Sequence, residues 1–403
     1  RLHKSDIQCM LDFVPNHTSP SYISGRLLER GKEVVESHYA DGQLKILERW
    51  YNHYGSMTAP GDSDRAPDRY LKDSAGLSDF NTDNPRVANY IRDAARFWVL
   101  EKGVDALRLD SIKHVDPDFL RRMCEDVAEE AYRKRNRELF IVGEWYGGGA
   151  NEASSVDFVN HADHCELLDF GLYYELKKVL AGSQSMRVLD QHLNLRRQAF
   201  RGRESWQVTF MDNHDTRRIA VDLEDPGSGA GLPRALVHQR MDLGMALIMT
   251  LPGIPSIYYG TEQYLANFGE EWQGNSYMVG YEPFSRPMMP KDFKADTRMC
   301  RIIRTLAELR RRSIALQQAP YEERWLDDNT LVFQRAIGDD VVVVAANRGP
   351  PRSITVEQLK LADGEYRDLL AEKTAPPIQV SGGAARLDLP REGVVVLSSR
   401  VNP

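Results

Sequence analysis

Short apolar runs alternate with longer amphipathic segments along the first three quarters of the chain. Runs of apolar residues bounded by polar or turn residues predict buried strands, which span 6–12, 104–109, 139–143, 166–170, 207–211 and 254–259. Segments whose apolar residues recur every three or four positions predict helices, which span 85–102, 117–135, 172–181, 186–199, 234–250 and 296–312. Strands that alternate with helices are typical of a parallel sheet, so we expect an α/β fold.

Two regions depart from this alternation. Residues 20–80 contain few periodic apolar runs and many Gly, Pro, Asp and Tyr residues, which favours an irregular inserted domain. After about residue 317 the chain changes to short strands separated by turns, which predicts an appended antiparallel β-sandwich. The expected domains are therefore a catalytic barrel at 1–19 and 81–316, the inserted domain at 20–80 and a C-terminal β domain at 317–403.

The six predicted strands of the alternating region fall short of the eight that a closed (β/α)8 barrel needs. The chain begins abruptly in a strand, and its first residue is Arg1 rather than Met. We therefore expect a TIM barrel that lacks its first two strands in this chain, with further sequence upstream. A signal peptide would lie in that upstream part, so secretion and a cytoplasmic location are both open.

Composition and charge limit the classes of partner. The net charge of −7 and the pI near 5.9 argue against binding to nucleic acid or to an acidic membrane surface. The sequence has no run of eighteen apolar residues, so a membrane span is not expected. Its four cysteines are widely spaced and form no CxxC motif, so neither a zinc site nor a disulfide scaffold is predicted. We expect a monomer with a neutral substrate.

Charged residues follow the predicted strands. The apolar run that starts at Gly103 ends on Arg108 and Asp110, which are two positions apart and therefore leave the same face of a strand. Glu144 and Asp215 follow later strands, and in a parallel barrel such positions converge on one mouth. A single acid of this kind is more often a helix cap or a solvated loop residue. Their recurrence at successive strand ends favours a site in which two carboxylates flank a glycosidic bond.

Six motifs carry a resemblance to a known family. They are Asp12–His17 (DFVPNH), Leu77–Asn81 (LSDFN), Gly103–His114 (GVDALRLDSIKH), Gly143–Trp145 (GEW), Phe210–Asp215 (FMDNHD) and Gly253–Glu262 (GIPSIYYGTE). In these motifs the sequence strongly resembles the α-amylase family of retaining glycoside hydrolases, glycoside hydrolase family 13. It is closest in motifs to α-amylases and cyclodextrin glucanotransferases, and the resemblance covers nearly the whole chain.

The resemblance implies a role for each matching residue. Asp110 matches the nucleophile, Glu144 the general acid and base, and Asp215 the third catalytic carboxylate. Arg108 would hold Asp110 ionised, and the pKa of Glu144 should be raised by a less polar setting that includes Trp145. The residues that match substrate-binding positions of the family are His17, Lys113, His114 and His214. Arg108 and Trp145, which lie beside Asp110 and Glu144, are further substrate-binding candidates.

The resemblance also implies a structural Ca²⁺. Asn16, Asp79 and the backbone carbonyl of His114 occupy matching positions, and all three offer the oxygen ligands that Ca²⁺ prefers. A further acidic ligand should come from residues 20–76. The sequence does not rank the candidates, which are Asp62, Asp64, Asp68 and Asp73.

The function that the resemblance implies is the retaining hydrolysis of internal α-1,4-glucosidic bonds in starch-like glucans or malto-oligosaccharides. One alternative is a transglycosylase of the cyclodextrin glucanotransferase type. Cyclodextrin glucanotransferases usually carry an aromatic residue at the position where this sequence has Ala75, and this sequence has a single C-terminal β domain. Both features favour water, rather than a sugar, as the acceptor of the glycosyl group. A second alternative is a non-catalytic carbohydrate-binding or transporter-associated member. Such members typically lose catalytic carboxylates, and this sequence keeps all three.

Overall fold

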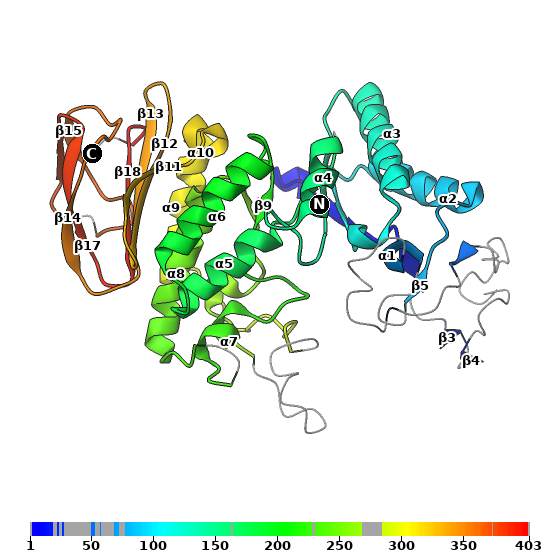
Figure 1. Ribbon diagram of the computed structural model, residues 1–403, viewed down its shortest axis with the longest axis horizontal. Helices are drawn as coiled ribbons and strands as arrows, with labels where there is room; N and C mark the ends of the chain where they lie inside the picture. Colours follow the sequence, from blue (N-terminus) through cyan, green and yellow to red (C-terminus); the bar gives the residue numbers. More distant parts are fainter. Residues whose placement is uncertain are drawn as a thin grey trace. The chain divides into compact units, whose positions relative to one another are not determined.

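The computed structural model forms two compact units. They comprise Arg1–Gly148 with Glu152–Leu168, and Gly149–Asn151 with Asp169–Pro403. The residues that the structure describes are 2–18, 22–23, 26–27, 50–52, 57, 68–71, 77–162, 164–227, 230–267, 284–372 and 374–401 (Figure 1).

A parallel four-stranded sheet lies at the centre of the first unit. Its order is β1-β6-β7-β8, and each neighbouring pair is parallel. The strands are β1 (Met10–Phe13), β6 (Ala106–Leu109), β7 (Phe140–Gly143) and β8 (Glu166–Leu167). Every residue of β6 is buried, as expected for an inner strand of a parallel sheet with both faces covered. The register places Asp12 opposite Arg108, so polar residues of neighbouring strands meet at one edge of the sheet.

Capping residues fix where the main helices of this unit begin. α2 (Pro85–Arg96) and α3 (Pro117–Arg135) each start with proline, and the side chains of Asn84 and Asp116 accept hydrogen bonds from the first turns. α2 continues as a π-helical turn, Phe97–Glu101. The shorter elements are α1 (Asp68–Leu71), α4 (Ala153–His161), the antiparallel pairs β2 (His17–Thr18) with β5 (Ser78–Asp79) and β3 (Tyr22–Ile23) with β4 (Arg26–Leu27), and the 3₁₀ turns Leu2–Ser5 and Ile112–His114.

The second unit continues the α/β pattern. Strands β9 (Val208–Thr209) and β10 (Ile254–Pro255) form a parallel pair. Its helices are α5 (Phe170–Ala181), α6 (Met186–Ala199), α7 (Ile219–Glu224), α8 (Arg234–Thr250), α9 (Arg298–Arg312) and α10 (Ile314–Gln318), with a 3₁₀ turn at Thr261–Gln263. Residues 243–249 of α8 are all buried, which explains why that stretch is apolar on every side of the helix.

Two antiparallel four-stranded sheets complete this unit, in the orders β11-β12-β13-β18 and β14-β17-β16-β15 (Figure 1). The strands are β11 (Glu322–Leu326), β12 (Thr330–Ile337), β13 (Asp340–Asn347), β14 (Arg352–Val356), β15 (Gly364–Tyr366), β16 (Ile378–Ser381), β17 (Ala384–Leu389) and β18 (Gly393–Ser398). On β13, Val342 and Val344 belong to the hydrophobic cluster shared with the helices, whereas Val341 and Val343 belong to the cluster between the two sheets. Both faces of β13 are therefore buried, which accounts for its unbroken apolar run.

The predicted elements have counterparts in the structure. All six predicted parallel strands are present but shorter, and the helices predicted at 117–135, 186–199 and 234–250 have the predicted bounds. The helix predicted at 85–102 changes to π-helical geometry after Arg96, and the short helices α1, α4, α7 and α10 were not predicted. The boundaries of the inserted and C-terminal domains stay predictions, since most of residues 20–76 lies outside the described part. None of the described helices has the length and apolar character that a bilayer-spanning helix requires.

Candidate active site

One guanidinium group contacts carboxylates from the ends of three neighbouring strands of the first unit. Nη1 of Arg108 donates hydrogen bonds to Oδ1 of Asp12, at 2.8 Å, and to Oδ1 of Asp110. Nη2 of the same arginine lies 3.0 Å from Oε2 of Glu144. The predicted shared face of Arg108 and Asp110 is therefore confirmed, and the parallel register of β1, β6 and β7 adds Asp12 and Glu144 to the group.

The carboxylates around Arg108 keep its guanidinium positively charged. Burial lowers the pKa of Arg108, but the carboxylates of Glu144, Asp12 and Asp110 outweigh it and hold that pKa above its usual value. Asp110 is partly exposed, whereas Glu144 is only 4% exposed.

The loop after β6 fixes the spacing of the two catalytic candidates. The backbone N–H of Glu144 donates to the carbonyl of Leu109 at 2.8 Å, and the N–H of Ile112 donates to the carbonyl of Glu144 at 2.9 Å. Gly143 leaves room for the side chain of Ile112, because a Cβ atom there would lie 2.3 Å from Cδ1 of Ile112. A carboxylate oxygen of Asp110 and one of Glu144 consequently lie within 4.8 Å of each other.

That spacing has a chemical meaning. In retaining glycosidases the two carboxyl groups are about 5–5.5 Å apart, whereas inverting enzymes separate them by about 6.5–9.5 Å to admit a water molecule. One oxygen of Asp110 and one of Glu144 lie within 4.8 Å of each other, so the two carboxyl groups are close enough to act on one glycosidic bond. The pair can therefore supply a nucleophile and a proton donor to opposite sides of one bond.

His17 lies near the same carboxylates. Its Nδ1 is 2.6 Å from Oδ1 of Asn16, which identifies Nδ1 as the donor of this hydrogen bond. Burial lowers the pKa of His17, an effect partly offset by the negative charge of Asp110. His17 is thus neutral near pH 7 and can exchange hydrogen bonds with a sugar hydroxyl.

The predicted calcium ligands also lie in the first unit. The pairing of β2 with β5 places His17 opposite Asp79, and both Asn16 and Asp79 are buried. Nδ2 of Asn52 donates to Oδ2 of Asp79 at 2.8 Å, and His114 is half-buried in the 3₁₀ turn after Asp110. Buried oxygen donors suit a hard cation such as Ca²⁺, so the chemistry of Asn16 and Asp79 fits the ion, and calcium binding at these residues stays a prediction. Of the four unranked acids, Asp68 starts α1 and its side chain is not described; Asp62, Asp64 and Asp73 lie outside the described residues.

The structure corrects the expectation for Trp145. Its side chain is 2% exposed and packs against Phe158 of α4, with ring centroids 5.9 Å apart. A ring inside the core of the unit offers no face to a sugar, so Trp145 is a packing residue. Its neighbour Tyr146 is 46% exposed. Lys113, another substrate-binding candidate, is buried in the turn that follows the nucleophile candidate.

In the second unit, the motif Phe210–Asp215 follows β9 and divides into a buried and an exposed part. Asp212 is buried, and its carboxylate accepts hydrogen bonds from the N–H of Ile219 at 3.1 Å and from the hydroxyl of Thr261 at 2.9 Å. Burial raises the pKa of Asp212 to about 6. The hydrogen bonds of Asp212 therefore fix the loop that follows β9. In the same loop, the side chains of His214 and Asp215 are partly exposed, pair at 2.9 Å and can reach a ligand.

Arg286 was not predicted as a site residue. Its Nη2 donates to Oδ1 of Asp215 at 2.9 Å, and its Nε donates to the carbonyl of His214 at 3.0 Å. The hydroxyl of Ser285 donates to the same carbonyl at 3.3 Å. Arg286 stands in a loop without periodic pattern, far along the chain from Asp215, so the sequence gives no sign of this contact.

A parallel α/β sheet whose strand ends present a close pair of carboxylates around one arginine has the residue types that a glycoside hydrolase requires. The comparison with protein families agrees, since the model described as "Alpha amylase, catalytic domain" matches residues 1–304. The chain belongs to the α-amylase family. Family membership and the similar solved structures imply a (β/α)8 barrel followed by a C-terminal β domain.

Individual relatives carry two kinds of name. The chain is 34% identical to a cyclomaltodextrin glucanotransferase of Klebsiella oxytoca over 99% of this chain, and it spans 62% of that protein's length. It is similar to the solved structure of CldA, a cyclomaltodextrin glucanotransferase with a three-domain ABC distribution, with a TM-score of 0.79, 27% identity and coverage of 100% of this chain and 77% of that one. An Anoxybacillus α-amylase gives a TM-score of 0.75 at 25% identity, covering 100% of this chain and 78% of that one.

Asp110 and Glu144 thus come together within the first unit, and His214 and Asp215 within the second. The expectation that all three carboxylates share one cleft stays a prediction.

Proposed function

We propose that this chain cleaves α-1,4-glucosidic bonds of starch-like glucans with retention of configuration, as an α-amylase that passes the glycosyl group to water. The observation that carries the proposal is that an oxygen of Asp110 and an oxygen of Glu144 lie within 4.8 Å of each other. Arg108 contacts both of these carboxylates. Family membership and the α-amylase among the similar structures support the same substrate class.

The mechanism assigns one step to each carboxyl group. The Asp110 carboxylate attacks the anomeric carbon and forms a glycosyl ester, while the Glu144 carboxylic acid protonates the departing glycosidic oxygen. The resulting Glu144 carboxylate then removes a proton from water, which attacks the ester and releases Asp110. Two inversions restore the α configuration.

Arg108 orients the carboxylate of Asp110, since its guanidinium contacts both Asp110 and Asp12 on the neighbouring strand. His17 and His214 would bind sugar hydroxyls near the cleaved bond, and Asp215 would bind further hydroxyls and favour a distorted ring. Lys113 and His114 would border the leaving-group side. A Ca²⁺ held by Asn16, Asp79 and the carbonyl of His114 would supply structural support to the loop after β6.

A second candidate function is transfer of the glycosyl group to a sugar hydroxyl. The 34% identity to a cyclomaltodextrin glucanotransferase favours it. The similar glucanotransferase with a three-domain ABC distribution supports it too, because that protein combines this activity with only three domains. A single C-terminal β domain therefore does not favour water over a sugar acceptor, and Ala75 lies outside the described residues. Both activities share the Asp110 ester and differ only in the acceptor.

Product analysis with maltoheptaose tests the proposal. We expect the first products detected by proton NMR to be α-anomers, because the double displacement retains configuration. We expect mass spectrometry to show linear products that take up one ¹⁸O atom from labelled water per cleavage. Cyclic or lengthened products without label would establish the transfer function instead, and an initial β-anomer would contradict both.

A further inference from the structure

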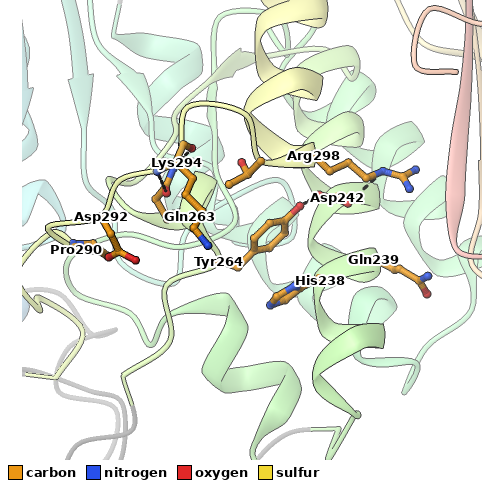
Figure 2. Close-up of a pocket in the computed structure, with 10 residues that line it drawn as sticks. His238, Gln239, Asp242, Gln263, Tyr264, Pro290, Asp292, Lys294 and Arg298 are labelled. Atoms are coloured by element: carbon orange, nitrogen blue, oxygen red, sulfur yellow. Dashed lines mark hydrogen bonds and ion pairs between the residues drawn. The ribbon is translucent and has the colours of Figure 1, made fainter. Parts of the chain in front are cut away.

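A cavity of about 570 Å³ opens among four segments of the second unit (Figure 2). They are the N-terminal half of α8, the turn at Gln263 and Tyr264, the loop 290–294 and the start of α9. The described residues that line it are not among those assigned to the candidate active site. Its volume falls within the range of about 300–1,000 Å³ that is usual for small-molecule sites.

A buried carboxylate forms part of the wall. Asp242 is 6% exposed, and its Oδ1 accepts a hydrogen bond from the hydroxyl of Tyr264 at 2.6 Å. Its Oδ2 lies 3.4 Å from Nε of Arg298 (Figure 2). Burial raises the pKa of Asp242 to about 6, so the carboxylate is ionised near pH 7 despite its setting. A buried acceptor beside a tyrosine hydroxyl and an arginine is a polar anchor of the kind that orients ligands.

The charges around the cavity cancel. Asp242 and Asp292 supply two negative groups, Lys294 and Arg298 supply two positive groups, and burial lowers the pKa of His238 so that its ring stays neutral near pH 7. A phosphate would meet two carboxylates and a divalent cation would meet two cationic side chains. A neutral ligand with many hydroxyls can instead donate to the carboxylates and accept from the cations.

The cavity also has an aromatic wall and a fixed frame. The rings of His238 and Tyr264 stack at 4.1 Å with an interplanar angle of 16°, which gives a rigid surface against which the apolar face of a sugar can pack. The side-chain amide of Gln263 exchanges hydrogen bonds with the backbone N–H and carbonyl of Lys294, at 2.9 and 3.0 Å. These bonds tie two walls together, so little ordering is required when a ligand enters.

We propose that this cavity is a second carbohydrate-binding site, which takes one or two rings of a neutral sugar and is separate from the residues that cleave the substrate. The choice of an α-1,4-linked glucan as that sugar rests on the proposed function. Such a cavity would bind a glucan chain at a second site besides the candidate active site. Binding at one site would then raise the local concentration of the chain at the other.

Titration of the Glu144→Gln protein with maltotriose tests the second site. We expect isothermal calorimetry to resolve two classes of site, and hydrogen exchange of residues 238–242 to slow when maltotriose is present. In the Glu144→Gln background, Lys294→Ala and Asp242→Asn should each weaken one class at least about tenfold and leave the other unchanged. Lys291→Ala is the control, because it removes a nearby exposed lysine that does not line the cavity.

Three outcomes would overturn the second site. A single class of site that Lys294→Ala and Asp242→Asn leave unchanged would do so while the proposed function stands. Binding of inorganic phosphate that slows exchange at 238–242, with no effect of maltotriose there, would replace the sugar by an anion. No binding of maltotriose, together with no cleavage of starch by the unsubstituted protein, would overturn both proposals.

Discussion

The two buried arginines Arg108, in the first unit, and Arg335, in the second, differ in the kind of group that they contact. Arg108 contacts carboxylates of three strand ends, and these hold its pKa above the usual value. Arg335 on β12 is fully buried, and its hydrogen bonds among the described residues all go to backbone carbonyls, those of Thr250, Leu251, Leu316 and Ala319. Burial, reinforced by the nearby charge of Arg310, lowers the pKa of Arg335 to about 9.

The difference separates a reactive group from a structural one. Carbonyls at helix ends need donors, and Arg335 satisfies several of them where water is excluded. Such a network stabilises the fold and brings no acid, base or nucleophile near a ligand. Carboxylates held close together around Arg108, by contrast, are costly for stability unless the cation is present, and they can carry out acid–base and nucleophilic chemistry. The two regions therefore predict opposite responses to substitution.

The largest effect is expected at the carboxylates around Arg108. Glu144→Gln should lower kcat on starch by about 10²–10⁴-fold, because the amide cannot protonate the leaving oxygen, with no fall in the midpoint of thermal unfolding. Glu138→Gln is the matched control, since Glu138 is exposed and precedes the same strand β7 at its other end. Equal turnover of the two variants would remove Glu144 from the mechanism.

A large effect on stability is expected at Arg335. Arg335→Leu leaves buried carbonyls without their donor, so we expect unfolding to become easier by at least about 3 kcal/mol. For a unit of this size the melting midpoint should fall by about 6–12 °C. Arg386→Leu on β17 is the control, because its side chain is 74% exposed and should change stability by no more than about 0.5 kcal/mol. An unchanged melt of Arg335→Leu would show that the carbonyls do not depend on it.

A smaller and more specific effect is expected from conservative changes at both positions. Arg108→Lys keeps the charge but loses the planar fork that reaches Asp12, Asp110 and Glu144 together, so kcat should fall by about 10–10²-fold. Arg335→Lys should leave kcat of the folded protein unchanged and lower only its melting midpoint. If the two lysine variants lose activity equally, the distinction between the two arginines is wrong.

The sequence predicts much of this arrangement because the relevant geometry is local. Residues two apart on a strand share a face, which placed Arg108 beside Asp110, and the ends of parallel strands meet, which brought Glu144 to the same group. The unbroken apolar run at residues 341–346 by itself favours a strand, in agreement with β13. Its burial on both faces required knowledge of what packs on each side.

Contacts that do not follow from the pairing of parallel strands could not be predicted. The buried ring of Trp145 packs against Phe158 of α4, and the sequence did not predict this short helix. Arg286 reaches Asp215 from a loop that has no pattern, and Arg335 sits in a strand where a charged residue is normally taken to face solvent. Each of these depends on tertiary packing that overrides the local preference of the residue.

Trapping of the glycosyl-enzyme tests the central claim most directly. The Glu144→Gln protein should accept α-maltotriosyl fluoride, because fluoride departs without an acid, and should then release the sugar slowly, because no base activates water. Peptide mass spectrometry is expected to find the trisaccharide attached to Asp110, and Asp110→Asn should abolish the adduct. Attachment to Asp12, the other partner of Arg108, or rapid hydrolysis with no adduct on any carboxylate, would contradict the assignment of Asp110 as nucleophile.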